Sequence, residues 1–126
     1  MMEKDVAPAL RFALREYRLY INLGLLASLG NPLYLEFLFD GERKRLVISG
    51  SMKRSKYSYE IPKRIYRDAD DECYISRMTL TEAFRIRMDW DRRENYRVTG
   101  QYVEHLGMAL FDLTQAVIVG KEDDIA

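Results

Sequence analysis

The sequence has little of what several classes of protein require. It contains one cysteine, Cys73, and one histidine, His105, in 126 residues. A single cysteine excludes an intrachain disulfide, which fits a reducing compartment. The longest apolar run, around residues 23–29, is far shorter than the roughly 20 residues that cross a bilayer. The charged start Met1–Asp5 leads into no apolar stretch, so no signal peptide is expected. We therefore expect a cytoplasmic protein without a membrane span.

Motifs for catalysis or bound groups are also scarce. His105 has no cysteine or carboxylate neighbours at metal-ligand spacing. Four acids within residues 68–72 precede Cys73. Their negative charge is expected to raise the pKa of the Cys73 thiol, whereas a nucleophilic cysteine needs a lowered pKa. Asp89 and Asp91 face two arginines and fit a helix end better than a pair of catalytic carboxylates. No glycine-rich phosphate loop occurs. We expect no enzymatic activity, no metal and no cofactor.

Length and patterning together predict one α+β domain over residues 1–126. Alternating apolar residues indicate strands within residues 17–23, 33–39, 45–49, 57–61, 73–77, 96–104 and 108–113. Residues 116–119 fit a strand or a helix end. We expect a mainly antiparallel sheet with two or three short helices. Segments 17–49 and 73–113 both run strand, helix, strand, strand, which suggests two related halves joined by residues 50–67.

Three helices are expected from their end signals. Pro8 favours a short N-terminal helix through Leu14. Asn22 is expected to cap a second helix, which Gly30 and Pro32 then end. The third is expected to begin at a capping box, Thr79 to Glu82, in which the glutamate reaches back to the cap. The aromatics expected in the core are Tyr34, Phe37, Phe39, Phe84, Trp90 and Phe111.

Positive charge is concentrated in residues 43–67, which we call the basic segment. It holds nine Lys or Arg and one acid, Glu60, a formal charge of +8 in a chain whose net charge is zero. Such clusters with interleaved tyrosines are typical of polyanion-binding surfaces. Tyr57 or Tyr59 could add stacking if exposed. The residues predicted to contact nucleic acid are Arg43, Lys44, Arg45, Lys53, Arg54, Lys56, Tyr57, Lys63 and Arg64.

Three interpretations of the basic segment remain open. It is a solvated surface that pairs with the acids of residues 68–72, a nucleic-acid surface, or a docking site for an acidic protein partner. A second acidic group, Glu122, Asp123 and Asp124, could screen it within this chain or a neighbouring one. The preferred hypothesis is a non-enzymatic DNA-binding or DNA-associated accessory protein, and the alternative is a structural or protein-interaction module. A homodimer is compatible with both, since symmetric assembly doubles the basic surface.

Two resemblances accompany this hypothesis. One is to the swapped-hairpin half-barrel of AbrB/SpoVT-type regulators, which these residues resemble: Tyr20–Asn22, Leu25 and Leu26, Leu29 and Gly30, Pro32, Tyr34–Asp40 and Arg45–Ile48. That resemblance implies interleaved dimers that bind DNA, although no DNA-contacting arginine maps to a matching position. Leu29–Pro32 with Tyr34, Tyr96–Gly100 and Phe111–Leu113 resemble small proteins encoded near recombinases in bacterial mobile elements. The second resemblance implies no activity.

Overall fold

Two antiparallel five-stranded sheets form the framework of the protein. The computed structural model describes residues 6–68 and 71–120. Sheet A has the order β10-β7-β1-β2-β6 and sheet B the order β5-β3-β4-β9-β8. The strands of sheet A are β1 (Ala9–Ala13), β2 (Arg18–Ile21), β6 (Cys73–Ser76), β7 (Asn95–Thr99) and β10 (Val117–Val119). Those of sheet B are β3 (Tyr34–Asp40), β4 (Arg45–Ser51), β5 (Tyr59–Glu60), β8 (Gln101–Val103) and β9 (Met108–Asp112). The α+β class and the antiparallel pairing are as predicted.

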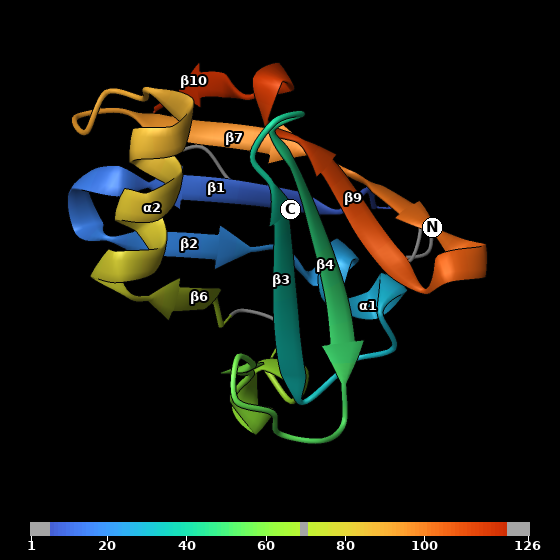
Figure 1. Ribbon diagram of the computed structural model, residues 1–126. Coiled ribbons are helices and arrows are strands. Elements are labelled where there is room, and N and C mark those ends of the chain that lie inside the picture. Colours follow the sequence, from blue (N-terminus) through green and yellow to red (C-terminus); the bar gives the residue numbers. More distant parts are fainter. Residues whose placement is uncertain (1–5, 69–70, 121–126) are drawn as a thin grey trace.

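The two sheets cross at a steep angle. In Figure 1 the β3–β4 hairpin runs across β1 and β2, and helix α2 (Met78–Met88) lies on the same side of sheet A as this hairpin. Orthogonal packing of this kind encloses the side chains of both inner faces. The second helix, α1 (Leu23–Ser28), follows β2. One face of sheet A is thus covered by sheet B and α2 together.

An aromatic cluster joins the sheets to α2. The ring of Phe84 on α2 lies 5.3 Å from Phe12 on β1 and 5.2 Å from Phe39 on β3, both centroid to centroid. Trp90 packs on Phe12 and stacks on Tyr96 of β7 at 4.5 Å. Offset and edge-on aromatic pairs add roughly 0.5–1.5 kcal/mol each beyond area burial. Aromatics from four elements therefore fix how the layers meet.

The end signals of α1 are confirmed. Asn22 is its N-cap, and the side-chain oxygen accepts hydrogen bonds from the backbone of Leu25 at 2.9 Å and of Ala9 at 3.0 Å. The side-chain amide donates to Ala7 O at 2.9 Å. Gly30 follows with a φ of 82°, the left-handed conformation that glycine adopts at helix ends. One buried amide thus caps α1 and also holds the start of β1.

The predicted N-terminal helix is wrong, because residues 9–13 form strand β1. β1 lies between β7 and β2 in the middle of sheet A, and all five of its residues are buried. A strand buried on both faces loses the alternation of polar and apolar residues that marks a half-exposed strand. A short apolar run cannot then be told from a helix by periodicity.

The predicted capping box of α2 is also wrong. The N-cap is Arg77, whose side chain makes no capping bond, and Thr79 lies inside the helix. Glu82 instead binds Arg85 and Arg92, with N–O distances of 3.0 and 2.7 Å. A carboxylate held by two guanidinium groups does not reach back to the helix start.

The two segments suggested as related halves distribute their strands differently. β3 follows α1 and lies in sheet B, whereas β7 follows α2 and lies in sheet A. Their order of elements is shared, but the equivalent strands do not occupy equivalent places.

The strand predicted over residues 96–104 is interrupted at Gly100, where the chain leaves sheet A as β7 and enters sheet B as β8. A Cβ placed on Gly100 would collide with the ring of Phe111 and lie 2.8 Å from Leu110 O. The Gly100 N–H also donates to Pro8 O at 2.7 Å. Only a glycine lets the backbone pass this close to β9.

We expect Gly100→Ala to lower the free energy of unfolding by about 1–3 kcal/mol, because the methyl group forces β9 and its buried phenylalanine to move. Urea unfolding followed by circular dichroism measures this change. Gly120→Ala is the matched control, since a Cβ there meets nothing within 4 Å. Equal stabilities of the two variants would contradict the close packing at Gly100.

Candidate nucleic-acid interface

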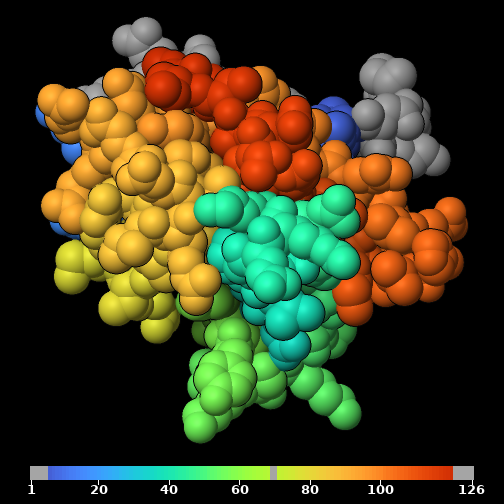
Figure 2. Space-filling model, turned by 45° about the horizontal axis from the view of Figure 1, so that its top comes forward, coloured from blue at the N-terminus to red at the C-terminus, as the bar shows by residue number. Residues whose placement is uncertain are grey.

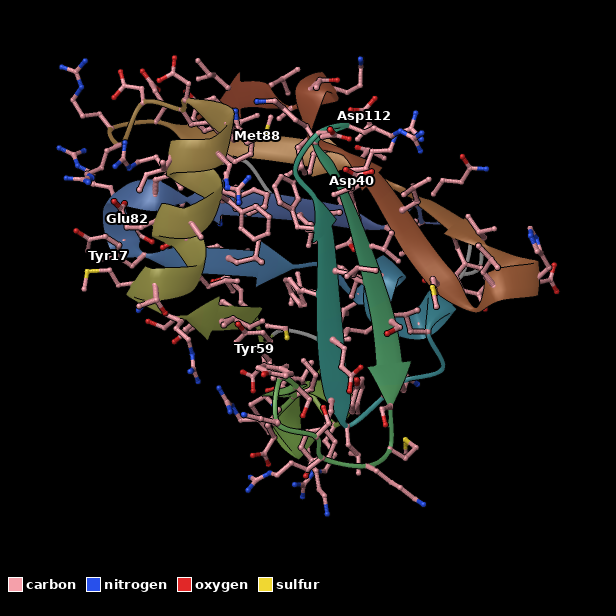
Figure 3. The ribbon with its side chains drawn as sticks, viewed as in Figure 1. Tyr17, Asp40, Tyr59, Glu82, Met88 and Asp112 are labelled. Atoms are coloured by element: carbon pink, nitrogen blue, oxygen red, sulfur yellow. The ribbon has the colours of Figure 1, made fainter. Side chains whose placement is uncertain are left out.

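The structure separates the residues predicted to contact nucleic acid into two groups. Arg43, Lys44 and Arg45 lie at the β3–β4 turn, and the other six lie beyond the far end of β4. β4 has seven residues, so the groups are about 20 Å apart. Figure 3 shows Asp40 and Asp112 at the turn end of the hairpin and Tyr59 at the opposite end.

The cations at the turn are partly engaged by neighbouring groups. Lys44 Nζ donates to Arg87 O at 3.0 Å, and Arg45 stands opposite Asp112 on β9. The pKa of Asp112 lies below its ordinary value, chiefly because Thr114 Oγ1 donates a hydrogen bond to its carboxylate, with the charge of Arg45 adding to this. The three cations at the β3–β4 turn thus lie at one end of sheet B.

The second group surrounds the loop between β4 and β5. In Figure 2 the green segment around residues 50–60 stands out from the body of the protein. Ser55 ties the loop down, since its hydroxyl donates to Glu36 on β3 at 2.6 Å and its backbone N–H donates to Ser58 Oγ at 2.9 Å. Arg54 pairs with Glu60 at 3.6 Å. Among the described residues, Lys53 and Lys56 form no ion pair and are exposed.

Lys63 and Arg64 belong to a short 3-10 turn, Lys63–Tyr66. The turn is fixed by buried Ile65 and by Tyr66, whose hydroxyl donates to Pro32 O. Burial raises the pKa of Tyr66. Arg64 pairs with Asp71 at 3.3 Å. Part of the basic segment is thus neutralised by the acidic residues that follow it, as the interpretation of a solvated surface paired with residues 68–72 expects.

A groove of about 500 Å³ lies between this loop and the segment from β6 to the start of α2. Three cations line it together with three tyrosines: Arg54, Lys56, Arg77, Tyr34, Tyr59 and Tyr74. Ser55, Ser58 and Ser76 add hydroxyl groups, and Glu60 adds one acid. Of the residues predicted to contact nucleic acid, Arg54 and Lys56 line the groove, and Tyr59, which was considered for stacking, lines it as well. Tyr57 is 75% exposed and does not line the groove, and its ring centroid lies 5.4 Å from Lys56 Nζ.

Contacts behind the groove hold its aromatic rings in place. Arg77 lies 5.3 Å from the centroid of Tyr59, which also packs edge-on against Phe37. The rings of Tyr74 and Tyr20 pack with their centroids 5.4 Å apart, and the guanidinium carbon of Arg18 lies 4.4 Å from the centroid of Tyr74. Tyr34, which we expected in the core, lines the groove instead. The groove thus places positive charge next to fixed rings.

Sequence reasoning missed Tyr34, Tyr74 and Arg77. All three lie outside the basic segment. They reach the groove because β6 pairs with β2 at the edge of sheet A while β5 pairs with β3 at the edge of sheet B. A search for tyrosines in the predicted strands could have listed Tyr34 and Tyr74. It would not have shown on which side of the groove each one lies.

The other residues considered for catalysis or metal binding are not brought together in the structure. His105 is exposed in a short turn, Glu104–Leu106, and the carboxylate of Asp91 is held by Arg93 at 3.0 Å. In the described ranges, no three or more His, Cys, Asp or Glu are grouped so as to hold a metal ion. Nor does any helix there have the length and apolar character needed to cross a membrane.

No protein-family model matches the chain, and searches of curated proteins and of solved structures likewise find no match.

The Cys73 thiol is buried, and burial raises its pKa to about 11. At pH 8 only about one thiol in a thousand is then ionised, and the thiolate is the reactive form. We expect iodoacetamide to label the native protein on the order of 100-fold more slowly than the urea-unfolded chain, whose thiol has an ordinary pKa. Labelling followed by mass spectrometry tests this. Equal rates at pH 8 would contradict a buried, protonated thiol.

Proposed function

We propose that the protein is a non-enzymatic DNA-binding accessory protein and that a single strand of nucleic acid binds in the groove between the β4–β5 loop and β6. The observation that carries this proposal is the presence of three cations and three tyrosines in one groove. Proteins that hold single strands combine a positively charged groove, which follows the phosphates, with aromatic side chains on which bases stack.

The size and composition of the groove favour an unpaired strand over a duplex. A volume of about 500 Å³ lies in the range of pockets that enclose a small ligand, and stacking requires bases that are not paired. The serine hydroxyls can donate to phosphate or base oxygens. Lys53 on the loop and Lys63 in the turn after β5 are exposed and add positive charge outside the groove.

This function fits a cytoplasmic protein, and a homodimer would present two grooves to one strand. The same surface could instead receive an acidic protein segment, because carboxylates also bind arginine and lysine. Stacking distinguishes the two, since an acidic peptide does not need the tyrosines.

The first test changes the charge of the groove. Fluorescence anisotropy with a labelled single strand, over a salt series, compares the natural protein with Lys56→Gln/Arg77→Gln. Each phosphate neutralised adds about 0.7 to the slope of log affinity against log salt for single strands. We expect the double variant to bind more weakly and its slope to be smaller by about 1.4.

The matched control is Arg43→Gln/Arg87→Gln, which removes two exposed cations at the opposite end of β4. We expect its affinity and salt slope to be close to those of the natural protein. Equal losses in both double variants would mean that binding follows net charge and not the groove. An absence of binding at low salt would refute the proposal.

The second test changes the aromatic surface. We expect Tyr74→Leu to weaken binding by about 1–3 kcal/mol, which is typical of the loss of one stacked base. Tyr57→Leu, outside the groove, should bind as the natural protein does. A loss confined to Tyr57→Leu would move the contact to the tip of the loop. If Tyr74→Leu is unchanged while the charge variant is weakened, an acidic partner becomes the better explanation.

A further inference from the structure

The outer face of sheet A, turned away from sheet B, carries a row of arginines and tyrosines. Val117, Arg97, Arg11, Tyr20 and Tyr74 stand directly opposite one another on β10, β7, β1, β2 and β6. Figure 1 shows sheet B and α2 on the other face. The two arginines lie outside the basic segment, so they form a second concentration of positive charge.

Arg11 and Arg97, which we call the arginine pair, are neighbours with the same charge. Like charges directly opposite in an antiparallel pair repel. Arg11 is only 7% exposed, and the Nε atoms of both arginines are buried without a hydrogen-bond partner in the described part of the chain. The guanidinium of Arg11 lies 4.1 Å from the ring centroid of Tyr20, a contact that leaves its N–H donors available. Two adjacent guanidinium groups form a donor set suited to a carboxylate.

We propose that the acidic residues Glu122, Asp123 and Asp124, which lie outside the described residues, bind the arginine pair. A carboxylate there would screen the repulsion between the two guanidinium groups and accept hydrogen bonds from buried donors. Buried charges in proteins are normally paired in this way. The acidic group is the nearest one along the chain after β10, the strand that pairs with the strand of Arg97.

The chain is long enough for this contact. β10 ends at Val119, which stands opposite Asn95, two residues along β7 from Arg97. Arg11 is one strand further on, so it lies about 10 Å across the sheet and about 7 Å along it from Val119. An extended chain advances about 3.3 Å per residue, so residues 120–124 can return over the outer face. The side chains of arginine and aspartate shorten the remaining gap.

A double-mutant cycle on the full chain tests the contact. The acidic variant Glu122→Gln/Asp123→Asn/Asp124→Asn is measured by urea unfolding in the natural background and in an Arg97→Gln background. We expect the acidic variant to raise the unfolding equilibrium constant about tenfold in the natural background, as for lost hydrogen bonds to charged groups. In the Arg97→Gln background it should have little further effect. Additive effects would overturn the proposal.

The matched control is Glu42→Gln/Glu72→Gln/Glu104→Gln, which removes the same charge from exposed positions elsewhere. It should leave the unfolding constant nearly unchanged. Because Arg97→Gln itself could fail to fold, the Nε–Hε resonances of Arg11 and Arg97 provide an independent measurement. They should shift in the acidic variant and not in the control. Unshifted resonances would overturn the proposal.

Other occupants of the arginine pair give different results. Millimolar inorganic phosphate should stabilise the acidic variant more than the natural protein if the chain's own carboxylates hold the site. Equal stabilisation of both would mean that the pair binds external anions, which overturns the proposal. If the effect of the acidic variant depends on protein concentration, the carboxylates come from a second copy, and the intramolecular contact is refuted.

Discussion

The close contact between Gly100 and Phe111 is the constraint on which the rest of the fold depends. At this point the chain passes from sheet A to sheet B, and β9 then returns beside β4. Phe111 is fully buried and fills the space that a side chain at position 100 would occupy. Because both sheets meet here without a gap, their crossing is fixed, and α2 can close the remaining side of the core with Phe84.

The fixed crossing of the sheets positions the candidate groove. β5 at one edge of sheet B and β6 at one edge of sheet A come together only because the sheets cross. One wall, from Tyr74 to Arg77, belongs to β6 and the N-cap residue of α2, while the other is a loop tied to β3 by Ser55. Binding residues on loops over a rigid framework are common. The framework here supplies the tyrosines, and the loop supplies most of the charge.

The sequence predicts the parts of this fold that depend on local physics. The α+β class, the hairpin of β3 and β4 and the cap at Asn22 follow from alternation, turn residues and a hydrogen-bonding side chain. β1 was missed because burial on both faces removes the polar alternation. The positive charge of the groove could be predicted, because the cations cluster along the chain. The approach of Tyr74 and Arg77 could not, because it results from pairing between strands that are far apart in sequence.

Tyr74 connects the groove to the outer face of sheet A. Its ring packs on the ring of Tyr20, and the guanidinium of Arg11 lies over that same Tyr20 ring. The Tyr20 hydroxyl donates a hydrogen bond to Glu16 and accepts one from Arg18. The position of this wall of the groove is therefore set by side chains behind it and not by the loop. Since Arg11 belongs to the same row, whatever neutralises the arginine pair also acts on the packing that supports Tyr74. Charge on one face of the sheet and the shape of the groove at its edge are thus parts of one packed row of side chains.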